Sequence, residues 1–74
     1  MTIEDYRIML GWSKQQLAEE AEIDITTLYN ALDPHKRIYK ATAGKIANGI
    51  NKGLKAKNLP EIKYTDLDGL QFAD

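Results

Sequence analysis

Two short helical patterns separated by only a few residues lie within residues 13–32, SKQQLAEEAEIDITTLYNAL, and they restrict the possible folds more than any other feature of the chain. Ser13 is a favourable N-cap for the first pattern, and its S-x-x-Q spacing to Gln16 predicts a capping box. Asp24 is a favourable N-cap for the second pattern. Because apolar residues recur at helical spacing in both, we expect two helices joined by a tight turn, over about 14–21 and 25–32.

A further helix is expected ahead of this pair, over about 3–10. Thr2 can cap its N-terminus, Asp5 has the spacing that completes a capping box, and Gly11 is typical of a helix C-terminus. Its buried face is expected to contain the apolar residues at helical spacing: Ile3, Tyr6, Met9 and Leu10. Trp12 also lies at core spacing, so we expect it to pack rather than to line a cofactor pocket.

A longer helix is expected over about 39–54, after a loop that begins at Pro34. A proline disfavours helical geometry in the residue before it, so the preceding helix should end near Asp33. The apolar stripe of the long helix is clear at spacings of three and four: Tyr39, Ala43, Ile46, Ala47, Ile50 and Leu54. Three glycines in this segment either permit close packing or weaken the helix, and both alternatives stay open: Gly44, Gly49 and Gly53.

The tail, residues 60–74, carries weaker signals. Thr65 or Asp66 could cap a last helical turn, and 62–65 is the only candidate strand. Because no segment favours a sheet, we predict an all-α fold, a compact bundle of four to five short helices in one domain over residues 1–74. The apolar residues near the tail could form a dimer contact or cover the core of their own subunit: Leu59, Ile62, Leu67, Leu70 and Phe72.

The chemistry available to the chain is narrow. It has no cysteine, and His35 is its only histidine, so neither a disulfide nor a metal site is expected. No glycine-rich loop joins a strand to a helix, and acidic pairs such as Glu19–Glu20 are typical of a helix surface. We therefore expect no enzymatic activity, no cofactor and no small-molecule substrate. With no run of 18 apolar residues and no signal peptide, we expect a cytoplasmic protein without a membrane segment.

Charge is strongly segregated along the chain, although the formal net charge is only −1. Residues 1–33 carry a net charge of −5, residues 34–59 carry seven basic residues and no acidic one, and residues 60–74 carry −3. A partner responds to the local field within about a Debye length, ~8 Å at physiological salt. The acid-free segment therefore favours an anionic partner; lysines that only keep a helix soluble are the alternative.

At four places the sequence resembles the lambda-repressor-like (Cro/repressor, xenobiotic-response-element type) helix-turn-helix family. SKQQLAEEA at 13–21 is similar to that family's TQxxLAxxA, and IDITTL at 23–28 is similar to its VSxxTI. TAGKIA at 42–47 resembles TLxKIA, and YTDLDGL at 64–70 loosely resembles VSLDDL. The resemblance covers most of residues 3–70. It implies a helix-turn-helix at about 14–32, in a regulator of phage or mobile-element type that is often a dimer on an inverted repeat.

Three positions depart from the family pattern. Glu22 stands where the turn usually has glycine, and a residue other than glycine adopts the left-handed conformation at a cost. Lys14 replaces a glutamine that commonly contacts DNA in the family. Pro34 replaces a glycine that often follows the recognition helix. These changes are compatible with the fold but bear on how the family would dock on DNA.

The leading hypothesis is a transcriptional regulator that binds double-stranded DNA, with residues 25–32 as the recognition helix in the major groove. Base edges would be contacted by the side chains expected on its outer face: Ile25, Thr26, Thr27, Tyr29 and Asn30. Phosphates would be contacted from the start of the preceding helix and from the basic loop: Lys14, Gln15, Lys36, Arg37 and Lys40. An inverted-repeat operator would require a homodimer.

The alternative hypothesis is an antirepressor-like modulator that uses the same face to bind a partner repressor protein. It is based on the acidity of residues 19–24 and on two apolar side chains, Ile25 and Tyr29, on a face that should be wet. Aromatic residues exposed in this way are typical of protein interface anchors. The sequence leaves open whether Ile25 and Tyr29 face DNA or protein.

Overall fold

The structure, a computed structural model, describes all 74 residues and is all-helical, which confirms the predicted fold class. Its elements are four α-helices and one short 3-10 helix: α1 (Ile3–Leu10), α2 (Lys14–Glu20), α3 (Ile25–Leu32), α4 (Lys40–Ala56) and η1 (Tyr64–Asp66). Each α-helix begins within one residue of the position that the sequence predicts. No helix is both long enough and apolar enough to cross a bilayer.

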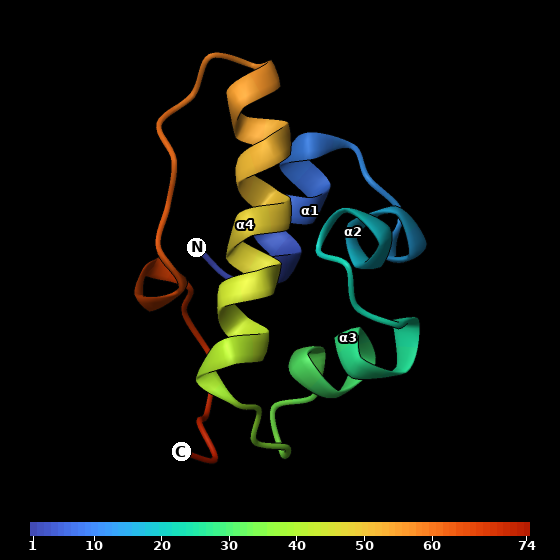
Figure 1. Ribbon diagram of the computed structural model, residues 1–74, viewed down its shortest axis with the longest axis vertical. Coiled ribbons are helices and arrows are strands. Elements are labelled where there is room, and N and C mark those ends of the chain that lie inside the picture. Colours follow the sequence, from blue (N-terminus) through green and yellow to red (C-terminus); the bar gives the residue numbers. More distant parts are fainter.

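Helix α4 forms the centre of the molecule (Figure 1). Helices α2 and α3 lie on one side of it, α1 lies behind it, and the chain after α4 returns along the opposite side. The core is one cluster of 14 buried apolar residues, to which α4 contributes five: Ala43, Ile46, Ala47, Ile50 and Leu54. Helix α4 therefore acts as the support against which α2 and α3 are held.

Local capping bonds fix where the helices begin. The Thr2 hydroxyl accepts a hydrogen bond from the Asp5 amide at 3.1 Å, and the Asp5 carboxylate accepts one from the Thr2 amide at 2.9 Å, so this capping box is complete. Gly11 ends α1 with a φ of 72°. The capping box predicted at α2 is only half formed, because the Ser13 hydroxyl accepts from the Gln16 amide at 3.0 Å and the Gln16 side chain makes no bond back.

Two glycines of α4 permit close packing. A Cβ atom on Gly49 would lie 2.7 Å from the backbone nitrogen of Ala21, so α2 reaches the backbone of α4 only because this position has no side chain. A Cβ on Gly53 would lie 2.8 Å from the Trp12 ring. No atom lies within 4 Å of a Cβ built on Gly44. Of the two alternatives, close packing is therefore confirmed for Gly49 and Gly53.

Two residues predicted in the core are on the surface. Tyr39 is 63% exposed because α4 starts one residue later, at Lys40, so the extended backbone of Tyr39 takes its side chain off the apolar stripe. Met9 is 41% exposed because Ile3 and Leu10 define the buried face of α1 and Met9 projects about 100° away from Leu10. Tyr6 and Trp12 were also predicted to pack in the core, and both do pack against it.

The tail covers the core of its own chain. Leu67 is buried, and three more apolar residues of the tail pack against the core: Ile62, Leu70 and Phe72. Leu59 is the exception and is exposed. The candidate strand at 62–65 is not formed; the Asn51 side chain instead exchanges two hydrogen bonds with the Ile62 backbone, at 2.9 and 2.8 Å. Nor does Thr65 or Asp66 act as an N-cap, because both lie within η1.

Candidate nucleic-acid interface

A tight turn joins α2 to α3. Glu22 adopts the left-handed conformation with a φ of 58°, as its place in the turn requires, and the Ile23 amide donates to the Ala18 carbonyl at 3.0 Å. The inner faces of both helices are buried: Leu17, Ala18, Ala21, Leu28 and Ala31. Packing of these residues leaves the opposite face of α3 exposed to solvent.

The outer face of α3 is smaller than the sequence suggests. Thr26 and Tyr29 are exposed, and Asn30 lies partly exposed beside them at the i+4 position from Thr26. Thr27 is half-buried, and its backbone amide is used by the Asp24 cap at 2.9 Å. The prediction that Ile25 is exposed is wrong, because Ile25 is half-buried and packs against the core. A helix whose buried stripe contains Leu28 also turns inward the side chain one turn before it.

The start of α2 meets the middle of this face. The ammonium nitrogen of Lys14 lies 5.6 Å from the centroid of the Tyr29 ring, a distance typical of a cation–π contact. Tyr29 is 52% exposed, so the ring still presents surface to a partner. Gln15 is exposed, and its amide donates to the Glu19 carboxylate at 3.4 Å. Two of the residues predicted to contact DNA are thus brought together from different helices.

The loop after α3 reaches back to the same face. The Lys36 ammonium donates to the Asn30 side-chain oxygen at 3.0 Å. Arg37 is exposed further along the loop, and Lys40 is exposed as the first residue of α4. The next backbone segment is held in place, because the Ile38 amide donates to the Gln71 carbonyl and the Ile38 carbonyl accepts from the Ala73 amide, both at 2.9 Å.

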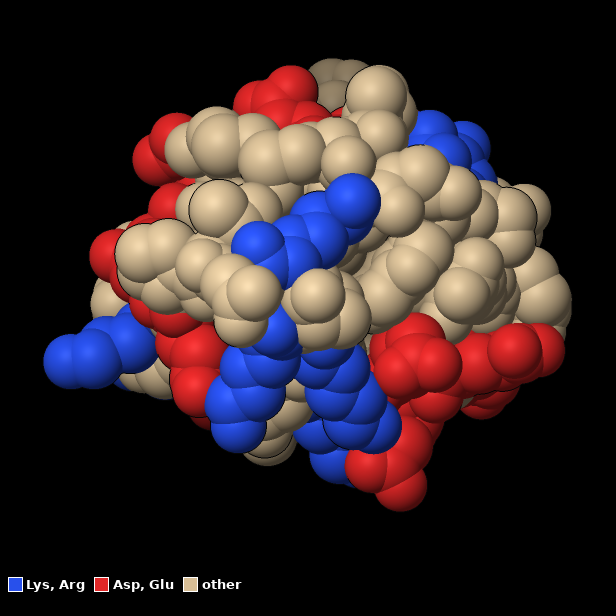
Figure 2. All heavy atoms as spheres, turned by 90° about the horizontal axis from the view of Figure 1, so that it is seen from above, with Lys and Arg blue, Asp and Glu red and all other residues tan.

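The two ends of the acid-free segment differ in their ion pairs. At the far end of α4, Lys55 pairs with Glu61 at 3.3 Å and Lys52 lies 4.0 Å from Glu22. The four cations predicted to contact phosphate form no ion pair with a carboxylate: Lys14, Lys36, Arg37 and Lys40. Because α4 is about 25 Å long, the two ends of the segment lie far apart. Seen onto the end where α4 terminates, basic side chains have acidic groups on both sides (Figure 2).

The acids near α2 face different ways, since the Glu19 carboxylate lies beside Gln15 and the Glu22 carboxylate lies 4.0 Å from Lys52. The backbone oxygen of Glu20 accepts from the Lys52 ammonium at 3.0 Å, so the end of α2 faces α4. Asp24 lies closer to the outer face, at the start of α3. Hydrogen bonds from Thr27 lower the pKa of the Asp24 carboxyl, which is therefore charged at neutral pH. The outer face keeps one fixed negative charge at the N-terminus of α3.

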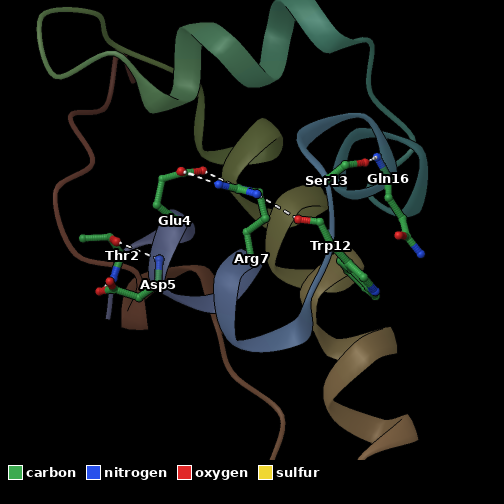
Figure 3. A network of polar contacts seen from close by, with 7 residues as sticks. All are labelled: Thr2, Glu4, Asp5, Arg7, Trp12, Ser13 and Gln16. Carbon is green, nitrogen blue, oxygen red and sulfur yellow. Dashed lines mark hydrogen bonds and ion pairs between the residues drawn. The ribbon is translucent and has the colours of Figure 1, made fainter.

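A network that the sequence analysis missed fixes the approach to α2 (Figure 3). The Arg7 guanidinium forms two hydrogen bonds with Glu4, at 2.7 and 2.8 Å, and a third with the backbone oxygen of Trp12 at 2.8 Å. The Arg7 bond is also the main reason why the pKa of Glu4 is lowered. The i, i+3 spacing of Glu4 and Arg7 is a signal that could have indicated the pair. The network holds the linker that ends at Ser13, immediately before Lys14.

The outer face of α3 thus combines an exposed aromatic ring, a hydroxyl and an amide with cations on either side. Such a surface can donate hydrogen bonds to a polyanion and contact its bases. No group of three or more His, Cys, Asp or Glu residues could hold a metal ion. Comparison of the chain with models of protein families, with curated proteins and with solved structures finds no match in any of the three.

Proposed function

We propose that the protein is a small DNA-binding transcriptional regulator of phage or mobile-element type. In this proposal α2, the turn and α3 act as a helix-turn-helix, and α3 enters the major groove of double-stranded DNA. The observation that carries the proposal is the position of Lys14 and Lys36. The first lies over Tyr29 and the second bonds to Asn30, so unpaired cations from two separate segments converge on the outer face of α3.

The proposed roles follow the exposure of each side chain. Thr26, Tyr29 and Asn30 contact base edges, because they form the outer face of α3. Ile25 contributes less, because it packs against the core. Thr27 is partly exposed, as Asn30 is, and contacts bases at the edge of this face. Phosphate contacts come from both sides of the groove, where α2 begins and where the loop leads into α4: Lys14, Gln15, Lys36, Arg37 and Lys40. Base contacts then specify the sequence, and phosphate contacts fix the register of the protein on the duplex.

Selection from a random double-stranded DNA pool tests the proposal. The protein should enrich a motif, and an inverted repeat with half-sites about one helical turn apart would indicate a homodimer. Binding to the enriched DNA should weaken steeply with salt, because each phosphate contact contributes about −0.9 to the slope of log K against log salt. Four cations therefore predict a slope of about −3 to −4. Failure to enrich any sequence, together with salt-insensitive binding, would contradict the proposal.

The second candidate is an antirepressor-like modulator that binds a partner repressor through the same face. The observation in its favour is the Tyr29 ring, which is 52% exposed, since exposed aromatic side chains are typical interface anchors. The other apolar anchor on which this hypothesis was based, Ile25, is only partly exposed because it packs against the core. Co-purification with a repressor encoded by a neighbouring gene, lost in Tyr29→Ala but kept in Lys36→Gln/Arg37→Gln, would favour this candidate over DNA binding.

A further inference from the structure

Asn30 and Lys36 form a pair whose hydrogen-bonding chemistry is restricted. The Lys36 ammonium lies 3.0 Å from the side-chain oxygen of Asn30. A lysine ammonium is only a donor, so it must face the amide oxygen and not the amide nitrogen. The orientation of the Asn30 amide is therefore set by chemistry, with its NH₂ group directed away from the lysine.

The groups that this pair presents to a ligand are mainly hydrogen-bond donors. They are the two hydrogens on the Asn30 amide nitrogen and the ammonium hydrogens of Lys36 that the bond does not use. In the major groove guanine presents two acceptors, N7 and O6, whereas adenine presents the acceptor N7 and the donor N6–H₂. An asparagine that binds adenine in the bidentate manner needs its own oxygen for N6–H₂. In this structure that oxygen already accepts one hydrogen bond from the Lys36 ammonium. An adenine N6–H₂ group that approached its second lone pair would also face this positively charged donor, whereas guanine O6 and N7 would accept from it.

We propose that Lys36 determines base specificity by bonding to the side-chain oxygen of Asn30 and placing a positively charged donor beside it. The pair selects guanine at the position that Asn30 contacts, whereas Asn30 alone would select adenine. This inference rests on the proposed DNA binding and adds to it the identity of one base and the residue that sets it. It also gives Lys36 a role distinct from that of its neighbour Arg37, which makes no hydrogen bond to the outer face of α3 and acts on phosphate alone.

The surroundings of Lys36 favour this contact over other partners of its ammonium group. No carboxylate forms an ion pair with Lys36. Its backbone is held on both sides, because the Lys36 amide donates to the Asp33 carbonyl at 3.2 Å and the Ile38 amide donates to the Gln71 carbonyl at 2.9 Å. The loop therefore presents the side chain toward α3 from a fixed starting point.

The test compares DNA selections for four proteins: the parent, Asn30→Ala, Lys36→Met and Arg37→Met. Asn30→Ala identifies the contacted position as the one where base preference weakens. At that position the parent should prefer guanine over adenine by about fivefold or more, and Lys36→Met should shift the preference to adenine. Arg37→Met removes the same charge, so it should lower affinity for all sequences and leave guanine preferred. Far-UV circular dichroism should show the same helix content in all four proteins.

The outcomes separate this inference from the proposed function. If the parent enriches a DNA motif but prefers adenine at the Asn30 position, or if Lys36→Met leaves guanine preferred, the inference is wrong and DNA binding stands. If Asn30→Ala weakens no position of a motif that the parent enriches, the inference is also wrong. If the parent enriches no DNA at all, both the inference and the proposed function are wrong.

Discussion

Lys14, the first residue of α2, places its ammonium group 5.6 Å from the centre of the Tyr29 ring, in the middle of α3. The contact joins one residue predicted to bind phosphate to another predicted to bind bases. Part of the acidity of residues 19–24 lies away from this contact, because Glu22 is 4.0 Å from Lys52 of α4, whereas Asp24 stays at the start of α3. The basic end of α2, and not its acidic end, borders the outer face of α3.

Substitutions of Tyr29 should distinguish the contribution of the ring to DNA affinity from that of the hydroxyl. Tyr29→Phe keeps the ring over which Lys14 lies, so DNA affinity should stay within about twofold of the parent. Tyr29→Ala should lower affinity several-fold, while stability changes by less than about 0.5 kcal/mol because the side chain is half exposed. Fluorescence anisotropy with the selected DNA and urea unfolding measure the two effects. Equal loss in Phe and Ala variants would show that the hydroxyl, not the ring, makes the contact.

Asp24 should couple helix capping to pH. Hydrogen bonds from Thr27 lower its pKa below the ordinary 3.8, so the charged carboxylate stabilises the fold above that pH and this contribution is lost as pH falls through the folded-state pKa. Asp24→Ala should lower the melting temperature at pH 7 by about 4 °C, and by less at pH 3. Thermal unfolding monitored by circular dichroism at the two pH values tests this. A decrease that is larger at pH 3 would be the wrong sign.

Asp24→Asn is the matched variant for binding. Asparagine is as good an N-cap as aspartate, so stability at pH 7 should change little. Removal of the negative charge at the start of α3 should raise affinity for DNA, since that charge borders the outer face and repels phosphate. The increase should shrink as salt is added, and anisotropy titrations at two salt concentrations measure it. Unchanged or lower affinity would place the N-terminus of α3 away from the DNA backbone.

Substitution of alanine for two glycines of α4 should change the stability of the protein in opposite directions. A Cβ at Gly49 would lie 2.7 Å from the nitrogen and 2.8 Å from the Cα of Ala21, both backbone atoms, so Gly49→Ala should destabilise the protein by about 1–3 kcal/mol. Gly44→Ala meets no atom within 4 Å and should stabilise it by up to about 1 kcal/mol through helix propensity. Urea unfolding gives both values. If Gly49→Ala were neutral, α2 would not depend on close approach to α4.

Asn51 should hold the tail in place. Its side chain makes both hydrogen bonds to the Ile62 backbone and is largely buried, so Asn51→Ala should cost about 1–3 kcal/mol and reduce hydrogen-exchange protection of the Ile62 amide. Asn48→Ala, on the exposed side of the same helix, should change stability by less than about 0.5 kcal/mol. A similar effect of the two substitutions would mean that the Asn51 amide adds nothing beyond helix propensity.

The features that the sequence predicted well are local. Thr2, Ser13 and Asp24 each cap a helix through an amide three residues away, so the signal and the structure lie within one turn. Residue types and spacing therefore determine where the helices begin, and the apolar stripes of Leu17 and Ile50 determine which faces are buried.

The features that the sequence missed depend on segments distant along the chain. The bonds between Asn51 and Ile62 join residues eleven apart across the end of α4, and periodicity carries no information about them. Ile25 was expected on the outer face because its position in α3 alone does not show how closely the core approaches it. The contact of Lys36 with Asn30 depends on the path of the loop, which the sequence indicated only as basic.

The most direct test of DNA binding through α3 compares two double variants that remove the same charge at opposite ends of α4. Lys36→Gln/Arg37→Gln should weaken DNA binding and reduce the magnitude of the salt slope by about 0.9 to 1.8, because Arg37 contacts phosphate alone and Lys36 also bonds to Asn30. Lys55→Gln/Lys57→Gln should leave DNA affinity and the salt slope nearly unchanged, because these residues lie at the far end of the helix. Equal losses in the two variants, or a loss only in the second, would contradict the proposed interface.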